Sequence, residues 1–263
     1  MMKEFSRQLT VLVLSCDKYC DLWYPFFYCL KKYWPDCPYR IVLGSNTKIY
    51  KSNIIKTILS GSDLNWSTSL KKLLEQIQTP YVFTWLDDSF PTAPVDTDVF
   101  TNTVEFMIKR NAKNVHAVAS PKPDKVIANG QFGEYFKGAP FRVITQGFWQ
   151  VNFLSEVLLE GENPWSFEIF GSYRCMYTDG FYCTIRPAIK YINVVEKGKI
   201  FQDSLNICRS LGIPLDISKR EVLKNMSFIK SELQKITFNT MIKIPWTYRI
   251  RVMNLIRRIL ISY

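Results

Sequence analysis

An apolar run that ends in two adjacent carboxylates constrains this chain more than any other stretch. Residues 79–92 read TPYVFTWLDDSFPT, so a β-prone run meets Asp87 and Asp88, and a proline-containing loop follows. Such a run is typical of a buried strand. In an open α/β sheet, the carboxyl end of such a strand opens onto the crevice where ligands bind. The sequence therefore predicts a ligand site at Asp87 and Asp88.

Strand-like and helical segments alternate before this run and set the expected fold. Leu9–Leu14 and Tyr39–Leu43 are short and apolar, and Asp21–Tyr33 between them carries aromatic residues and leucines at helical spacing. A third apolar segment spans Ile54–Leu59, and Trp66–Gln78 has the spacing of an amphipathic helix. Strands that alternate with helices in this way build parallel βαβ units. We therefore expect an α/β fold with a mixed, mainly parallel sheet flanked by helices.

The rest of the chain carries weaker signals of both kinds. Gly130–Pro140 contains glycines among aromatic residues, which is typical of a long functional loop rather than a packed element. Further strands are expected at Val115–Ser120, within Phe141–Phe153, and as a hairpin or a pair of short strands within Phe181–Val195. Further helices are expected at Thr97–Lys109, Leu154–Glu160, Ser204–Leu211 and Lys219–Ile236.

Cysteine usage and motif content exclude several classes of protein. The seven cysteines are odd in number and form no C-x-x-C pair, and His116 is the only histidine, so neither a zinc site nor a disulfide framework is supported. The P-loop, dinucleotide-binding, α/β-hydrolase and zincin motifs are absent. No apolar window is long enough for a membrane span, and Leu9–Leu14 suits a first strand better than a signal peptide. We expect a cytoplasmic protein with reduced thiols.

Net charge is +11, and most of it lies at the C-terminal end. From Lys197 to Tyr263 the chain has 13 Lys and Arg against 4 Asp and Glu, so +9 falls in that stretch. Residues 244–263 gather apolar side chains on one side of a helical wheel, although Arg249 also falls on that side. Such a helix suits an anionic membrane surface or a position docked on the protein's own core. We expect a main domain over residues 1–200 and a helical, basic region over residues 201–263.

Asp87 and Asp88 are the strongest candidates for chemistry. Adjacent carboxylates after a buried strand repel each other and destabilise the fold unless a cation or hydrogen-bond donors neutralise them. Oxygen ligands of this kind suit Mg²⁺ or Mn²⁺, which complete their coordination shells with water and phosphate oxygens. The alternative is a solvated turn or the N-cap of the next helix.

The order of these segments resembles a known family. The helix that begins WSxxL, the motif T-x-Y-V-x-x-x-L-D-D-x-F, and N-P-W-x-F-E at residues 163–168 follow one another along the chain. In this order they resemble bacterial glycosyltransferases of GT-A fold that build capsule, O-antigen or lipopolysaccharide glycans. The resemblance covers Leu9–Ser172. It implies a GT-A-like, Rossmann-related fold and a nucleotide-sugar donor.

The resemblance also implies roles for three carboxylates. Asp88 would be the metal ligand, and Asp87 would contact the ribose or assist the metal, although the family's usual motif is D-x-D and this one is L-D-D. Glu168 would be the general base that takes the proton from the acceptor hydroxyl, and its aromatic neighbours would raise its pKa toward working pH. A first-turn role against the helix dipole is the alternative for Glu168. The rival bases are Glu162, Glu134 and Asp179.

Donor contacts are expected where the early strands end. By the resemblance, these residues would flank the base, the ribose and the phosphates. Each one alone is also a common loop or helix-cap residue. The set comprises Ser15, Cys16, Asp17, Ser45, Asn46, Asp63, Trp66, Ser67 and Lys71.

The expected function is transfer of a sugar from a nucleotide-sugar donor to a lipid-linked or polysaccharide acceptor, with Mn²⁺ or Mg²⁺ and with inversion. The C-terminal helix would hold the enzyme at the inner face of the cytoplasmic membrane. One alternative is a basic module that binds nucleic acid or membrane without catalysis, but no nucleic-acid-binding signature is present. The other is a nucleotidyltransferase. Those enzymes carry a glycine-rich basic loop after the first strand, where this chain has SCDKYCD.

Overall fold

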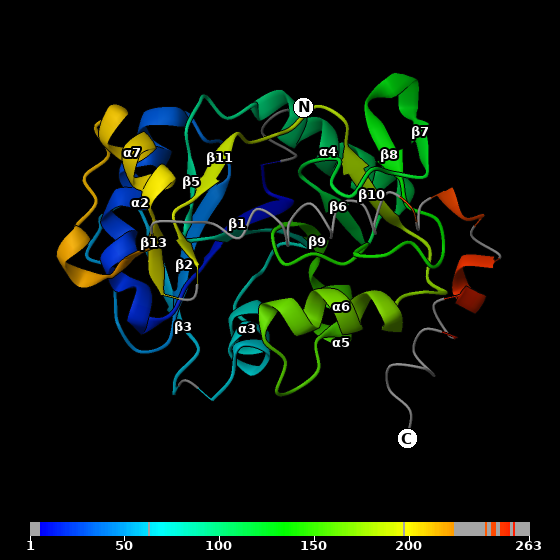
Figure 1. Cartoon of the computed structure of the whole chain (residues 1–263), viewed down its shortest axis with the longest axis horizontal. Helices are drawn as coiled ribbons and strands as arrows, with labels where there is room; N and C mark the ends of the chain where they lie inside the picture. The colour runs from blue at the N-terminus through cyan, green and yellow to red at the C-terminus, as the bar shows by residue number, and fades with distance from the viewer. Residues whose placement is uncertain are drawn as a thin grey trace.

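A nine-stranded sheet forms the centre of the computed structural model (Figure 1), which describes residues 6–62, 64–196, 198–223, 240, 243–245, 248–252 and 255. The strand order is β3-β2-β1-β4-β9-β6-β10-β8-β7. The strands are β1 (Leu9–Leu14), β2 (Arg40–Ser45), β3 (Lys56–Leu59), β4 (Tyr81–Leu86), β6 (Asn114–His116), β7 (Lys125–Ile127), β8 (Phe132–Glu134), β9 (Gly147–Gln150) and β10 (Phe181–Thr184).

The sheet is mixed, with a parallel half. Strands β3, β2, β1 and β4 are parallel neighbours, β9 is antiparallel to β4 and β6, and β10 returns parallel to β6. Strand β8 is antiparallel to β10 and β7, so β8 and β9 alone oppose the common direction among the described strands of this sheet. The predicted mixed, mainly parallel sheet flanked by helices is confirmed.

Helices cover both faces of this sheet (Figure 1). Residues of β1 alternate between two buried clusters: Val11 packs with one that includes residues of α2, α4 and α7, and Leu12 with one that includes residues of α3, α5 and α6. A strand buried on both faces explains why LTVLVL is a continuous apolar run. The helices are α2 (Cys20–Tyr33), α3 (Trp66–Leu74), α4 (Thr97–Arg110), α5 (Val151–Val157), α6 (Pro164–Arg174) and α7 (Gln202–Ser210).

Two smaller sheets and three short 3-10 helices complete the described structure. Strand β5 (Ser89–Pro91) pairs antiparallel with β11 (Tyr191–Asn193). Strand β13 (Lys199–Phe201) lies between β12 (Val195–Glu196) and β14 (Val222–Leu223). The 3-10 helices are η1 (Asp17–Tyr19), η2 (Ala128–Gly130) and η3 (Ile217–Lys219).

Two expected elements were wrong, at Gly130–Pro140 and at the start of the helix from Lys219. The loop expected at Gly130–Pro140 contains β8, where a side chain at Gly133 would meet Pro123 Cβ at 2.5 Å, so glycine permits close packing there. Of the two alternatives expected within Phe181–Val195, the pair of short strands is confirmed as β10 and β11, which pair with separate sheets and so form no hairpin. The helix expected from Lys219 is interrupted by β14, and residues 224–236 lie outside the described part.

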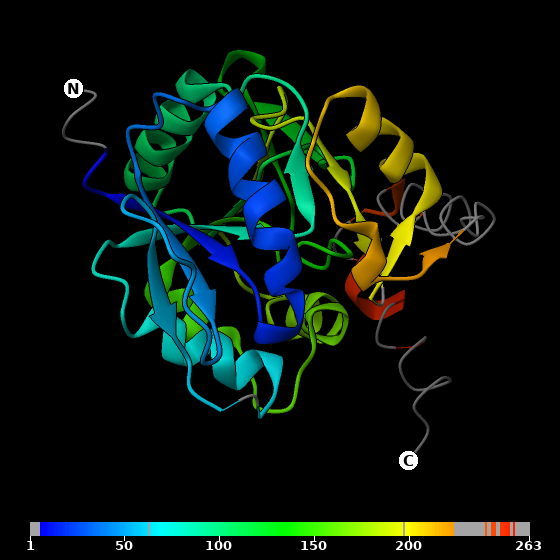
Figure 2. The same cartoon turned by 90° about the vertical axis from the view of Figure 1, so that its left-hand side faces the viewer.

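Residues 201–223 pack against the main sheet. Leu205, Cys208 and Ile213 belong to the same buried cluster as Val11. The Nζ of Lys32 on α2 donates to the carbonyl of Leu211 at 3.0 Å, and Figure 2 shows α7 beside α2. The division at residue 200 falls inside β13 and stays a prediction.

The C-terminal helix expected over residues 244–263 lies largely outside the described residues. In the part described, Arg249 is 1% exposed and forms an ion pair with Asp124, whose side chain is 5% exposed. A Cβ at Gly138 would meet Ile250 Cγ1 at 2.8 Å, so this segment packs closely on the main domain. Burial of Arg249 explains why an arginine falls on the apolar side of the helical wheel.

Candidate active site

The carboxylates of β4 follow the strand end directly and meet the end of β1. Asp87 is 5% exposed, and its backbone N–H donates to the carbonyl of Leu14 at 3.2 Å. The hydroxyl of Ser15 donates to Asp87 Oδ2 and accepts from the indole Nε1 of Trp23 at 2.6 Å. Because the indole donates to that hydroxyl, the single Ser15 proton is available for an acceptor, and Asp87 Oδ2 lies closer to it than the Cys16 carbonyl at 3.3 Å.

Asp88 is held by its backbone rather than by an ion pair. The backbone N–H of Val194 donates to the carbonyl of Asp88 at 2.8 Å, where the chain enters β5. Helix α4 is capped by Asp96, which accepts from the backbone N–H of Val99, so Asp88 is not the cap of that helix. The Asp88 side chain is left to face the cavity described below.

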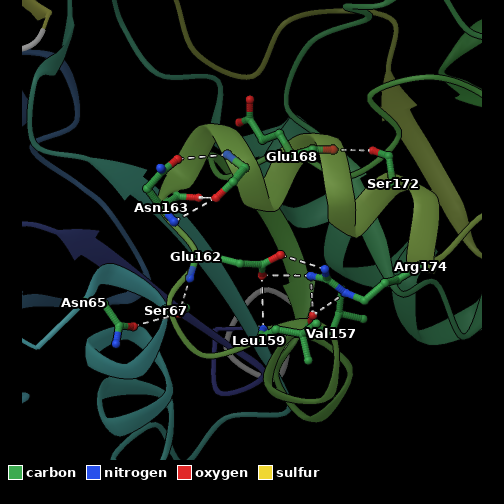
Figure 3. A network of polar contacts seen from close by, with 10 residues as sticks. Asn65, Ser67, Val157, Leu159, Glu162, Asn163, Glu168, Ser172 and Arg174 are labelled. Atoms are coloured by element: carbon green, nitrogen blue, oxygen red, sulfur yellow. Dashed lines mark hydrogen bonds and ion pairs between the residues drawn. The ribbon is translucent and has the colours of Figure 1, made fainter. Parts of the chain in front are cut away.

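Glu168 lies in the second turn of α6. Asn163 caps this helix by accepting from the backbone N–H of Ser166, and Pro164 occupies the first helical position. The backbone N–H of Thr145 donates to Glu168 Oε1 at 2.8 Å. Figure 3 shows the Glu168 carboxylate pointing away from the polar network beneath the helix. Its position past the first turn weakens a purely helix-dipole role.

The rival base Glu162 is engaged in that network. Arg174 Nη1 and Nη2 donate to its two carboxylate oxygens at 2.7 and 2.9 Å (Figure 3). Asp179 forms an ion pair with Lys137 at 3.0 Å. Neither of these carboxylates lines the cavity that holds Asp88, and Glu134 on β8 does not line it either.

One cavity of about 510 Å³ brings the candidate residues together. Four carboxylates line it, and no Lys or Arg of the described residues does so. The lining residues are Leu14, Ser15, Cys16, Tyr19, Trp66, Leu86, Asp87, Asp88, Thr145, Pro164, Trp165, Glu168, Asn193, Val195, Glu196 and Phe201. Among the described residues, the cavity lining is therefore acidic.

Burial shifts the pKa of three of these carboxyl groups. Burial and the Asp88 charge raise the pKa of Asp87 well above its ordinary value. Burial raises the pKa of Asp88 to about 6 and also raises the pKa of Glu168, against the hydrogen bond from Thr145. Burial raises the pKa of the Tyr191 phenol most, and the charges of Glu168 and Asp88 raise it further. Both carboxylates therefore lie near that ring.

Arg220, a basic group whose charge acts on Asp87 and Asp88, binds another carboxylate. Its Nε and Nη2 each donate to the Asp21 carboxylate at 2.7 Å, and its guanidinium lies 4.3 Å from the centre of the Tyr19 ring. It lowers the pKa values of Asp87 and Asp88, but burial outweighs it. Sequence reasoning missed Arg220 because it belongs to a segment that was expected to be a separate helix.

The predicted donor residues fall into two groups. Ser15, Cys16 and Trp66 line the cavity together with the carboxylates. Asp17 and Asn46 instead tie the ends of β1 and β2 together, since Asp17 accepts from the backbone of Lys48 at 2.9 Å and its own N–H donates to Asn46 Oδ1 at 3.1 Å. Burial acts to raise the pKa of Asp17, but the hydrogen bonds from residues 47 and 48 outweigh burial, so the pKa is lowered.

The other predicted donor contacts lie away from the cavity lining. Ser67 is fully buried, and its hydroxyl donates to Asn65 and accepts from the backbone N–H of Glu162 at 3.2 Å (Figure 3). Lys71 sits on α3, and Ser45 is buried at the end of β2. Asp63 lies outside the described residues.

The carboxylates of this cavity fit only a divalent metal that takes few of its ligands from the protein. The described residues contain no group of three or more His, Cys, Asp or Glu side chains that would enclose an ion. Mg²⁺ and Mn²⁺, however, need only one or two protein carboxylates when water and phosphate oxygens supply the other ligands. Asp88, with Asp87 beside it, matches that pattern. Separately, no helix among the described residues has the length and hydropathy to span a membrane.

Comparison with known proteins gives similarity at the level of solved structures. No protein-family model matches the chain, and no curated protein matches its sequence. The chain is similar to S. aureus TarS, with a TM-score of 0.48 and 10% identity, over 80% of this chain and 41% of that one. It thus spans about two fifths of that protein.

Two further structures show a similarity of the same order. One is a Pyrobaculum calidifontis mannosyltransferase in complex with GDP-Man and Mn²⁺, with a TM-score of 0.45 and 13% identity, over 73% of this chain and 58% of that one. The other is CMP:2-keto-3-deoxy-manno-octonic acid synthetase complexed with CTP. It has a TM-score of 0.47 and 11% identity, over 78% of this chain and 98% of that one. At these scores the function is argued from the site alone.

Proposed function

We propose that this chain is a metal-dependent glycosyltransferase that moves a sugar from a nucleotide-sugar donor to a lipid-linked or polysaccharide acceptor at the inner face of the cytoplasmic membrane. One observation carries the proposal. Asp87 and Asp88 share a cavity with Glu168, and the described lining supplies no basic side chain to balance them. A diphosphate can enter such a cavity only together with a cation.

The residues divide the work between the donor and the acceptor. Asp88 would hold Mn²⁺ or Mg²⁺, and Asp87, oriented by Ser15, would assist it or contact the ribose. When bound, the metal supplies electrostatic stabilisation for the nucleoside diphosphate that leaves. The aromatic faces of Trp66 and Trp165 line the cavity and are suited to stack on rings of the substrates.

Glu168 is proposed to remove the proton from the attacking acceptor hydroxyl. The Thr145 N–H donates to Oε1 and orients the carboxylate, and Oε2 is the oxygen proposed to accept that proton. A pKa raised by burial makes this carboxylate a stronger base. As the proton moves to Glu168, the acceptor oxygen would bond to the anomeric carbon and the nucleotide would leave from the opposite face, so the proposed transfer inverts the configuration at that carbon.

A nucleotidyltransferase is the competing proposal, and the site favours it less. That chemistry joins two highly charged substrates and relies on basic side chains around the phosphates. The loop between β1 and η1 contains no glycine, and the described cavity lining has no Lys or Arg. A nucleoside triphosphate that stabilised the protein more than any nucleotide sugar would favour this alternative.

A thermal-shift screen of UDP-, GDP-, CMP- and dTDP-sugars, each with and without Mn²⁺, tests the proposal. We expect one nucleotide class to raise the melting temperature when Mn²⁺ is present, because a ligand that binds only the folded state stabilises it. A flat screen, or a response to oligonucleotides alone, would contradict the enzyme assignment.

A further inference from the structure

The outward face of α6 is apolar, which reverses the usual arrangement of a surface helix. Trp165 is 57% exposed, Ile169 41% and Phe170 48%, and Tyr177 just beyond the helix is 62% exposed. A surface helix normally turns its large apolar side chains toward the core. This helix leaves most of them in contact with water.

The buried face of α6 shows why the helix is oriented this way. It consists of Phe167, Gly171 and Ser172, so two of its three buried residues are small. A Cβ at Gly171 would meet Val143 Cγ1 at 3.0 Å, so the helix packs close to the main domain through its small residues. The close packing at Gly171 leaves little room there for a larger side chain, and Trp165, Ile169 and Phe170 remain exposed on the same helix.

Basic and aromatic residues of the C-terminal segment lie beside the end of this helix. Ile250 packs at Gly138, whose N–H donates to the carbonyl of Met176, two residues past α6, at 3.0 Å. Figures 1 and 2 both place the described C-terminal residues next to that end of α6. While Arg249 and Ile250 face inward, the flanking Tyr248 and Arg251 are exposed.

This combination fits an anionic lipid bilayer. Exposed Trp, Tyr, Phe and Ile side chains insert at the boundary of headgroups and acyl chains, and nearby cations attract anionic headgroups. The chain carries a net charge of +11, which adds to that attraction. A purely glycan-binding platform would present aromatic faces only, whereas Ile169 offers no ring to stack on a sugar.

We propose that the exposed face of α6, with the docked C-terminal segment beside it, binds the surface of an anionic lipid bilayer. The inference deepens the proposed function, because Trp165 lines both this face and the cavity, with Glu168 one turn further along the helix. A bilayer on α6 holds the cavity mouth at the level of the headgroups. A lipid-linked acceptor then presents its hydroxyl to Glu168 without leaving the membrane.

Co-sedimentation with vesicles tests this surface without any sugar nucleotide. The double variant Ile169→Gln, Phe170→Gln changes two exposed side chains that do not line the cavity, and circular dichroism checks that it folds. We expect its partition onto phosphatidylcholine–phosphatidylglycerol vesicles to fall roughly tenfold or more relative to the unaltered protein. Binding to phosphatidylcholine alone should be weaker for both proteins.

The matched control is Ile54→Gln, Ile108→Gln, which removes two exposed isoleucines distant in sequence from α6 and should leave the partition unchanged. Equal partition of the α6 variant and the unaltered protein would overturn the proposal. So would a protein that ignores vesicles but self-associates through α6, which would make the partner a second copy. The donor-dependent thermal shift should persist in the α6 variant, so failure of this inference is distinguishable from failure of the proposed function.

Discussion

Asp124 and the pair Asp87 and Asp88 are carboxylates in two parts of this molecule, and they differ in the groups that balance their negative charge. Asp124 accepts from Arg249 through both guanidinium nitrogens and from the backbone N–H of Phe136 at 2.8 Å. Asp87 accepts from the Ser15 hydroxyl, and neither it nor Asp88 is ion-paired among the described residues. A buried charge is retained only with a partner.

We infer that the difference separates carboxylates that stabilise the fold from the two in the proposed site. Asp21 and Glu162 follow the pattern of Asp124, since each binds an arginine in bidentate geometry. The chain therefore supplies arginines where a carboxylate holds the fold together. The described residues place no such ion pair at Asp87 or Asp88, and in the proposed site a metal-nucleotide complex would balance them.

The largest expected effect is on transfer by Asp88→Ala. Removing the proposed metal ligand should lower the transfer rate by roughly a thousandfold or more, because the leaving diphosphate loses its counter-charge. The rate is measured by release of nucleoside diphosphate from the donor found in the screen. The fold should remain intact by circular dichroism, and unchanged turnover of the purified variant would remove this assignment.

Glu168→Gln should stop transfer by a different route. The amide keeps the shape of the side chain but accepts no proton, so the rate should fall roughly a hundredfold to ten-thousandfold. Donor affinity, measured by calorimetry with Mn²⁺, should stay within about twofold, since the base acts on the acceptor. Glu162→Gln is a poor control because it breaks a buried ion pair, whereas the exposed Glu196→Gln probes another carboxylate of the same cavity. Retained activity in Glu168→Gln would move the role to Glu196.

Arg249→Met tests whether the buried ion pair with Asp124 stabilises the fold. It leaves Asp124 buried without its cation, which should lower the free energy of unfolding by about 3–5 kcal/mol in urea denaturation. The exposed neighbour Arg251 offers a matched control, and Arg251→Met should change stability by less than about 0.5 kcal/mol. Equal effects of the two variants would show that the buried pair does not anchor the segment.

Asp88→Asn should raise the free energy of unfolding, whereas Arg249→Met should lower it. The pKa of Asp88 is raised from 3.8 to about 6, so the folded protein binds this proton more tightly than the unfolded chain does. The metal-free protein therefore loses stability at this site as pH rises from about 4 to about 6.

The variant removes that loss, so it should be about 1–3 kcal/mol more stable than the unaltered protein at pH 7 in chelator, but not at pH 4. Urea denaturation at both pH values measures this. A variant that is less stable at pH 7 would mean that the carboxylate is already balanced within the chain.

Much of the fold was predictable because its signals are local. The parallel strands β1, β2 and β4 are apolar runs bounded by polar or proline-containing turns, and α2 and α3 follow helical periodicity. Strands β12 to β14 were not predictable, since each has two or three residues and forms only through pairing with the others. No local pattern marks such pairing.

Part of the cavity lining was predictable for the same reason, while its role stays a prediction. The L-D-D strand end and the capped start of α6 are local motifs, and the fold places both beside one cavity. The partners of Asp17 and Asp124 were not foreseeable, because Thr47 is 30 residues from the first and Arg249 is 125 from the second. Such pairings depend on tertiary packing.

Binding of Mn²⁺, followed by the electron paramagnetic resonance signal of the free ion, tests the central claim most directly. The measurement is repeated with UDP, GDP, CDP and dTDP in turn. With one of them, the unaltered protein should bind more Mn²⁺ than that nucleotide binds alone, and the Asp88→Asn variant should not. If the nucleotide binds equally well without Mn²⁺, or if Asp88→Asn retains full Mn²⁺ binding, the carboxylate pair does not await a cation and the account is contradicted.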